Sequence, residues 1–207
     1  MSTAPSIFGE RFTHRLEAFS DLVFGFSLSL LATRLDIPTD AAQIFEPKRW
    51  GTFIITFAII CFLWLAHYKI FRHHFVPQIP DVMVNFIFLL GIAVAPYALQ
   101  IYLRFPGNRA SLTLYFGDFA LFFGALATLR WRALLQRRGD PDKDVRLREW
   151  RATVRQYTVV LVVVGSLIAM GLGAIPPEKF YSAAAVMFAL VAVVARFAVQ
   201  RLPGFLE

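Results

Sequence analysis

The sequence predicts an all-α membrane protein whose single domain, residues 1–207, contains six transmembrane helices. Of the 207 residues, 57% are hydrophobic and only 17% are charged, and the mean hydropathy is +0.58. A soluble domain of this length would carry about a quarter charged residues. The apolar residues form six runs of about 20 residues, each long enough to cross a hydrocarbon core of about 30 Å as a helix. The expected spans are residues 15–36, 52–70, 82–102, 112–135, 153–175 and 179–199.

The charge and the cysteine content exclude several classes of partner and site. The formal net charge is +7 at pH 7, but in so apolar a chain the excess arginines are expected in loops that face anionic lipid headgroups. Nucleic acid is not an expected partner, because no basic surface interleaved with aromatic residues lies outside the apolar runs. Cys61 is the only cysteine, which excludes an intrachain disulfide and a site with several thiolate ligands. No metal or other cofactor is expected.

The first span carries polar and charged residues at membrane depth. Its strictly apolar part, residues 22–32, is short for a span and is preceded by Ser20 and Asp21. A charged side chain at the bilayer centre costs about 2.5–3.5 kcal/mol on insertion scales. We therefore expect protein or water to shield these two side chains.

The second and third spans carry further polar residues near their ends. The second span ends in a polar cluster that comprises His67, Lys69, Arg72, His73 and His74. The third span follows Asp81 and contains Asn85 and Pro96. Proline removes a helical hydrogen bond, so we expect a kink near the outer end of the third span.

A long basic link, residues 136–152, joins the fourth and fifth spans. Its centre, Gly139-Asp140-Pro141, predicts the end of one helix and the start of the next. We expect a cytoplasmic helical hairpin here, with its arginines on anionic lipid headgroups. The fifth span then carries a ridge of small residues that permits close packing of another helix. The ridge consists of Gly165, Ala169 and Gly173.

The distribution of basic residues predicts the orientation of the chain in a cell membrane. With the N-terminus inside, fifteen of the 21 lysines and arginines lie on the cytoplasmic side and six on the other side. Cytoplasmic loops of membrane proteins carry the excess of lysine and arginine. Both termini of this multi-pass protein are therefore expected in the cytoplasm.

One stripe of the first span alternates apolar and hydroxyl side chains. At about 100° per residue, Ser20 and Asp21 fall on the flanks of this stripe. Apolar stripes normally mark faces buried within one subunit. The same stripe around a symmetry axis would instead line a pore with apolar constrictions, which are an accepted means of gating. The stripe consists of Arg15, Phe19, Leu22, Phe26, Ser29, Leu30 and Thr33.

Three short motifs resemble the transmembrane protein 175 family of potassium channels. The first is Arg15-x-x-x-Phe19-Ser20-Asp21, followed by Val23-Phe24 and the pair Leu30-Leu31. The second is Trp64-x-x-His67 in the second span, and the third is Asn85-Phe86 with Leu89 through Pro96. The resemblance covers the first three spans, whereas the last three match by length and hydrophobicity alone.

This resemblance implies a potassium-permeable channel, and no Thr-Val-Gly-Tyr-Gly filter string occurs in the chain. Single-repeat relatives assemble as homotetramers whose first helix lines the pore, so potassium ions and three further copies of the chain are the implied partners. Phe26 then stands at the narrowest ring, with Leu30 as the alternative, and Ser29 supplies the hydroxyl ring. Leu22 and Thr33 complete the implied pore lining. Arg34 stands where relatives carry an acid, and Asp36 is a candidate to compensate for it.

The flanking polar residues are expected to hold the first helix in place. Asp21 points sideways from the stripe, and Arg15, His67 and Asn85 are the partners available to it. Our hypothesis is a network of Arg15, Ser20, Asp21 and His67 that fixes the first helix against its neighbours. Phe19, Trp64 and Asn85 belong to the same signature motifs.

Two further functions remain open from the sequence. A proton-coupled secondary transporter would use Asp21 and His67 as a proton relay, although no internal inverted repeat supports this reading. A metalloenzyme would use His67, His73 and His74 as ligands. We expect His73 and His74 to contact headgroups instead, and therefore expect no enzyme.

Overall fold

The computed structural model describes residues 10–33, 40–41, 44–45, 47–71, 77–136 and 143–198. Six α-helices account for most of these residues, and a 3₁₀ turn, Pro177–Lys179, precedes the last of them. The expectation of an all-α chain with six helices is confirmed. The helices are α1 (Glu10–Thr33), α2 (Pro47–Phe71), α3 (Ile79–Arg104), α4 (Arg109–Gln136), α5 (Lys143–Gly171) and α6 (Phe180–Ala198).

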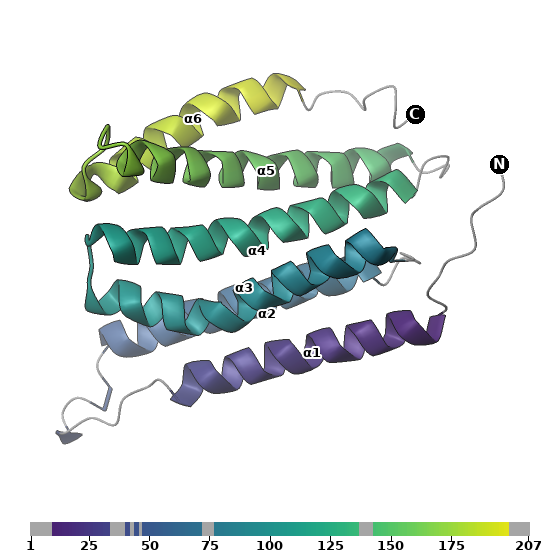
Figure 1. Cartoon of the computed structure of the whole chain (residues 1–207), viewed down its shortest axis with the longest axis horizontal. Coiled ribbons are helices and arrows are strands. Elements are labelled where there is room, and N and C mark those ends of the chain that lie inside the picture. The colour runs from purple at the N-terminus through teal and green to yellow at the C-terminus, as the bar shows by residue number, and fades with distance from the viewer. Residues whose placement is uncertain are drawn as a thin grey trace.

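The helices form an up-and-down bundle (Figure 1), in which most helices pack on their neighbour in sequence but α3 packs mainly on α1 and α4 rather than on α2. α1 packs against α2 and α3 at one edge of the bundle, and α6 packs against α5 at the opposite edge. The pair α3 and α4 forms the most extensive interface. α1 is therefore left open on the side that faces away from the rest of the chain.

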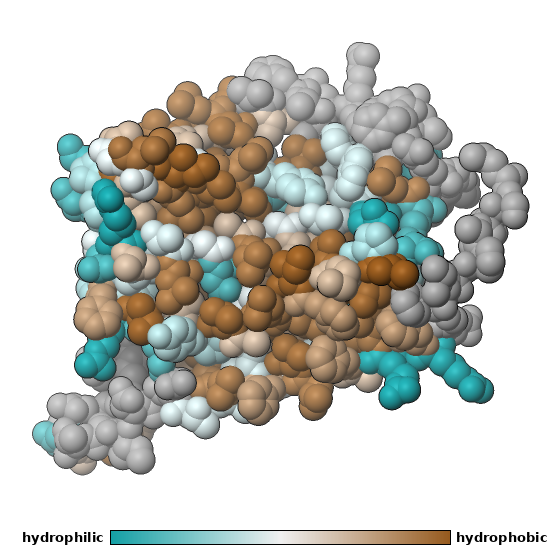
Figure 2. All heavy atoms as spheres, viewed as in Figure 1, coloured by the Kyte–Doolittle hydropathy of each residue, from teal (hydrophilic) through white to brown (hydrophobic). Residues whose placement is uncertain are grey.

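Five helices, α1 to α5, contain segments long and apolar enough to cross a membrane. The chain is thus a multi-pass membrane protein, and Figure 2 shows the apolar belt between polar groups at the two ends of the bundle. Among the described residues, α6 does not meet the same criteria. Its role as a sixth span stays a prediction.

The core lies where α3 and α4 meet and continues toward α1 and α2. Phe88 and Ile92 of α3 and Leu126 and Leu129 of α4 are completely buried. The two helices approach closely at Gly91, because a Cβ atom there would lie 2.8 Å from the Cβ of Phe122. α3 is thereby a fixed support on which α1 rests.

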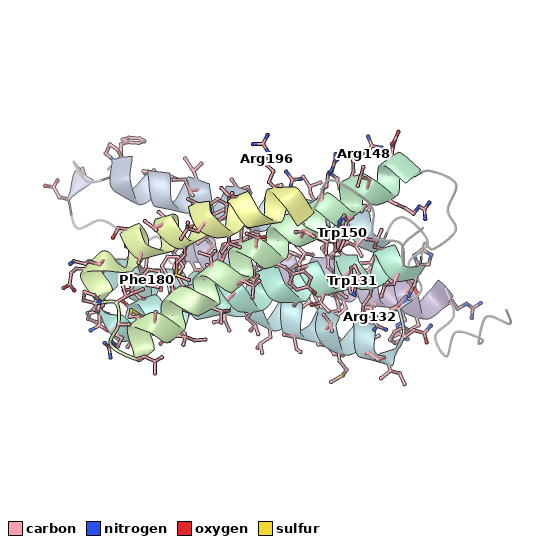
Figure 3. The ribbon with its side chains drawn as sticks, turned by 90° about the horizontal axis from the view of Figure 1, so that it is seen from above. Trp131, Arg132, Arg148, Trp150, Phe180 and Arg196 are labelled. Atoms are coloured by element: carbon pink, nitrogen blue, oxygen red, sulfur yellow. The ribbon has the colours of Figure 1, made fainter. Side chains whose placement is uncertain are left out.

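A buried ion pair joins the start of α3 to the end of α4. Asp81 is fully buried and accepts a hydrogen bond of 2.8 Å from the backbone N–H of Gln78, at the start of α3. Its second oxygen accepts a hydrogen bond from Nε of Arg132, which is labelled in Figure 3. Burial of a carboxylate requires such a partner.

The basic link is described only at its two ends. α4 extends to Gln136 and α5 begins at Lys143, so both helices continue beyond the apolar runs. The helix stop and restart expected at Gly139-Asp140-Pro141 lie outside the described residues. Trp131 of α4 and Trp150 of α5 pack with ring centroids 5.6 Å apart near this end (Figure 3).

One residue of the small-residue ridge of α5, Gly165, packs against α6 within the subunit. A Cβ atom on Gly165 would lie 2.9 Å from Cε of Met187 in α6, so this glycine permits the close approach of the two helices. Gly173 does not extend the ridge, because it follows the end of α5 with a φ of +80°. This left-handed conformation, which favours glycine, ends the helix.

Candidate functional site

The expected stripe of α1 lies on its open side. Leu22 is 68% exposed and Phe26 is 65% exposed in the single chain, and Ser29 and Thr33 are exposed beside them. Leu30 is half-buried. An apolar face without a partner in one subunit needs lipid, another subunit or a pore to cover it.

The two exposed hydroxyl groups of the stripe bind to their own helix. Oγ of Ser29 donates a hydrogen bond of 2.9 Å to the carbonyl of Gly25, and Oγ1 of Thr33 donates one of 2.9 Å to the carbonyl of Leu30. Because each hydroxyl proton is used within the helix, the oxygen lone pairs remain for a donor or a cation. Both hydroxyls can therefore act as acceptors on the open side.

The opposite side of α1 is buried against α2 and α3. Its buried residues are Leu16, Ser20, Phe24, Ser27 and Leu31. Ser20 and Ser27 are seven residues apart, which is two helical turns, so both hydroxyls face the neighbouring helices.

A directed chain of hydrogen bonds joins α2, α3 and α1 through three buried side chains. Nδ2 of Asn85 donates a hydrogen bond of 3.2 Å to Oγ of Ser20, which in turn donates one of 2.8 Å to the carbonyl of Leu16. With this amide orientation, Oδ1 of Asn85 accepts from Nε2 of His67 at 2.7 Å. The imidazole is stacked on the ring of Phe88, with centroids 5.2 Å apart and planes at 6°.

Ser27 forms a second contact between α1 and α3. Its hydroxyl donates a hydrogen bond of 2.7 Å to the carbonyl of Ile92. Pro96 lies within α3 four residues later and has no N–H, so the carbonyl of Ile92 lacks its helical partner. Sequence reasoning missed this contact, although a serine seven residues after Ser20 was a usable signal.

Asp21 binds Trp64 rather than any of its expected partners. Nε1 of Trp64 donates a hydrogen bond of 2.7 Å to Oδ1 of Asp21. The expectation that Arg15, His67 or Asn85 would bind Asp21 is therefore wrong. Trp64 precedes His67 by three residues, so both lie on the same face of α2 and reach α1 or α3.

The structure separates the remaining expected members of the network. Arg15 is exposed on α1, and no hydrogen bond or ion pair joins it to another residue within the described part of the chain. Phe19 is exposed and meets Phe86 of α3 edge to face, with centroids 6.1 Å apart. The polar contacts thus form two units, Ser20–Asn85–His67 and Asp21–Trp64.

No metal site exists among the described residues. No group of three or more histidine, cysteine, aspartate or glutamate side chains is arranged there to bind a metal ion. His73 and His74, and likewise Arg34 and Asp36, lie outside the residues that the structure describes.

Comparison with known proteins identifies relatives of the first half of the chain. The sequence model of the family described as "Endosomal/lysosomal potassium channel TMEM175" matches residues 15–96, which contain most of α1, all of α2 and much of α3. The resemblance expected from the three motifs is confirmed. The matched family consists of channels and not of enzymes.

Two curated relatives agree with this match. A protein named "Potassium channel" from Marivirga tractuosa is 30% identical over 92 residues, which cover 44% of this chain and 37% of the relative. The "Endosomal/lysosomal proton channel TMEM175" of Gallus gallus is 28% identical over 117 residues, which cover 50% of this chain and 22% of the relative. The matched part is therefore well under half of each relative.

Proposed function

Because the chain is related to the TMEM175 potassium channels through its first three helices, we propose that it is the subunit of a potassium-permeable channel. In this proposal four copies of the chain assemble around one axis, and the open side of α1 lines the pore. The observation that carries the proposal is the division of α1 into two sides. One side is held by Ser20 and Ser27 against its own subunit, and the other exposes Leu22 and Phe26 to whatever lies beyond the subunit.

Four copies of the stripe would produce alternating apolar and hydroxyl rings. Rings of Leu22 and Phe26 would exclude water and so control conduction, since narrow apolar segments of a pore dewet. Rings of Ser29 and Thr33 would offer oxygen lone pairs to a cation that has passed the apolar rings. Phe26 is the better candidate for the narrowest ring, because Leu30 is half-buried against its own subunit.

The polar contacts on the other side of α1 would position the pore helix. The Ser20–Asn85–His67 chain and the Asp21–Trp64 pair bind α1 at neighbouring heights to α3 and α2. Their role in the proposal is structural, and no ion passes them. The two residues required by the transporter alternative, Asp21 and His67, have separate partners, which weakens that alternative.

The proposed membrane orientation places both termini in the cytoplasm. The start of α1 lies at the same end of the bundle as the basic end of α4 and the basic start of α5 (Figure 1). The arginines at this end would contact the anionic headgroups of the inner leaflet.

Ion flux from liposomes tests the proposal. Purified protein should release potassium down its gradient with resolvable unitary currents, and Phe26→Ala should raise the flux about tenfold, the change given by a barrier lower by about 1.4 kcal/mol. Phe62→Ala is the matched control, because Phe62 of α2 is 64% exposed and lies off the stripe. Saturable, proton-coupled flux without unitary currents would contradict the channel and support a transporter.

A further inference from the structure

A basic groove lies between α5 and α6, away from the proposed pore helix. Its volume is about 900 Å³, within the range of ligand sites in proteins. α1 and α6 lie at opposite edges of the bundle (Figure 1), so the groove and the stripe are separate surfaces. The groove is lined by Arg148, Arg151, Arg155, Thr158, Val159, Phe188, Ala192, Ala195 and Arg196.

The basic and apolar residues of the groove are arranged along the axis of α5. The three arginines of α5 recur at intervals of three and four residues and so share one face of the helix. Arg196 of α6 lies across from them, and Figure 3 shows Arg148 and Arg196 pointing toward the same side of the molecule. From Arg148 to Val159 the groove extends about 16 Å along the helix and changes from charged to apolar.

The charged residues that line the groove are all basic. Within the described part of the chain, no acidic side chain lines it. The nearest acid along α5, Glu149, is directed to α4, where its Oε2 lies 3.7 Å from Nε of Arg130. An occupant with a negative head and an apolar body would therefore match both parts of the groove.

We propose that this groove binds one anionic phospholipid. Arg148, Arg155 and Arg196 bind the phosphate, and the acyl chains lie against Val159, Phe188 and Ala192. Arginine is suited to this role because its planar fork of N–H donors matches a phosphate group. The inference is independent of the proposed conduction pathway.

Native mass spectrometry of the full-length protein in a nonionic detergent, titrated with phosphatidylglycerol, tests the proposal. The double variant Arg155→Gln/Arg196→Gln should lose about 25-fold in affinity, since one arginine near an anionic surface contributes about fivefold. The matched control, Arg104→Gln/Arg109→Gln, removes two arginines from the opposite end and should retain the wild-type affinity. Equal losses in both double variants would indicate diffuse attraction to charge and would overturn the site.

A second variant tests the apolar half of the groove without a change of charge. Ala192→Trp fills the groove and should abolish retention of phosphatidylglycerol. Unchanged binding by this variant would show that the lipid lies elsewhere. Phosphatidylcholine should bind at least tenfold more weakly, and equal binding of the two lipids would contradict the role of the arginines.

Two further measurements use the unaltered protein. Glycerol 1-phosphate, which has the charge but no acyl chains, should not compete with phosphatidylglycerol, and effective competition would indicate a soluble anion instead. A photoactivatable phosphatidylglycerol should label peptides from residues 148–159 and 188–196. Labelling confined to other helices would overturn the proposal even if every variant misfolds.

Discussion

The hydroxyl of Ser27 in α1 lies 2.7 Å from the carbonyl oxygen of Ile92 in α3 and donates a hydrogen bond to it. Pro96 leaves that carbonyl without a helical N–H. Two buried polar groups, one on each helix, thus satisfy each other in an apolar environment. The contact holds α1 against α3 where neither helix could leave a polar group unpaired.

Replacement of Ser27 should destabilise the protein, because the carbonyl of Ile92 loses its hydrogen-bond donor. Ser27→Ala leaves this buried acceptor unpaired, and we expect a loss of about 1 kcal/mol in the free energy of unfolding. Thermal unfolding in detergent measures it. In a Pro96→Ala background the new N–H can pair with Ile92, so the loss should be smaller there. An equal loss in both backgrounds would contradict this explanation.

Replacement of Ser29, at nearly the same height of α1 as Ser27, should affect conduction and have little effect on stability. Ser29→Ala removes an exposed hydroxyl that binds its own helix, so stability should change by less than about 0.5 kcal/mol. If Ser29 lines the pore, unitary potassium conductance should fall in this variant. Ser27→Ala is its control, because that hydroxyl faces α3 and its loss should leave the unitary potassium conductance unchanged. A conductance unaffected by Ser29→Ala would contradict its place in the pore.

His67 and Asn85 should be energetically coupled. Each single alanine variant leaves a buried polar group of the other unpaired and should cost about 1–3 kcal/mol of stability. The double variant His67→Ala/Asn85→Ala should cost less than the sum, with a coupling of about 0.5–3 kcal/mol. Unfolding of all three variants measures the coupling, and additive losses would show that the contact contributes little.

Loss of the Trp64 donor should affect gating and leave selectivity unchanged. Trp64→Phe keeps the aromatic ring but removes the N–H that binds Asp21. We expect a changed open probability and an unchanged ratio of potassium to sodium permeability, measured from reversal potentials. Asp21→Asn keeps an acceptor oxygen for Trp64 and is the conservative control. A change confined to ion preference in either variant would refute the structural role of the pair.

Arg132 should be needed for the stability of the protein, because it neutralises the fully buried carboxylate of Asp81. Arg132→Met removes the charged partner of Asp81, and we expect a loss of about 3 kcal/mol or more in stability. The double variant Asp81→Asn/Arg132→Met removes the buried charge as well and should recover part of that loss. The yield and melting temperature of folded protein measure both effects. No recovery in the double variant would mean that the pair acts through packing rather than charge.

The helix ends show where sequence reasoning was limited. Hydropathy alone placed the start of the fifth span at residue 153, whereas the Asp140-Pro141 signal predicted an earlier start of its helix, and α5 begins at Lys143. The extra residues are rich in arginine and lie beyond the apolar run, so hydropathy cannot detect them although they favour a helix. The first helix likewise begins at Glu10 rather than at residue 15.

The sequence by itself determined the membrane class, the six helices and the grouping of the α1 stripe on one face. These properties are local, because a run of about 20 apolar residues and a period of 3.6 are written into consecutive residues. The three motifs likewise indicated the family. The use of the stripe as a pore lining remains a prediction.

Only the tertiary structure decided which polar groups meet. Asp21 and Trp64 are 43 residues apart, and Ser27 and Ile92 are 65 residues apart. The groove of arginines likewise requires α5 and α6 to pack side by side. Such contacts depend on how helices rotate against one another, which spacing within a single helix does not specify.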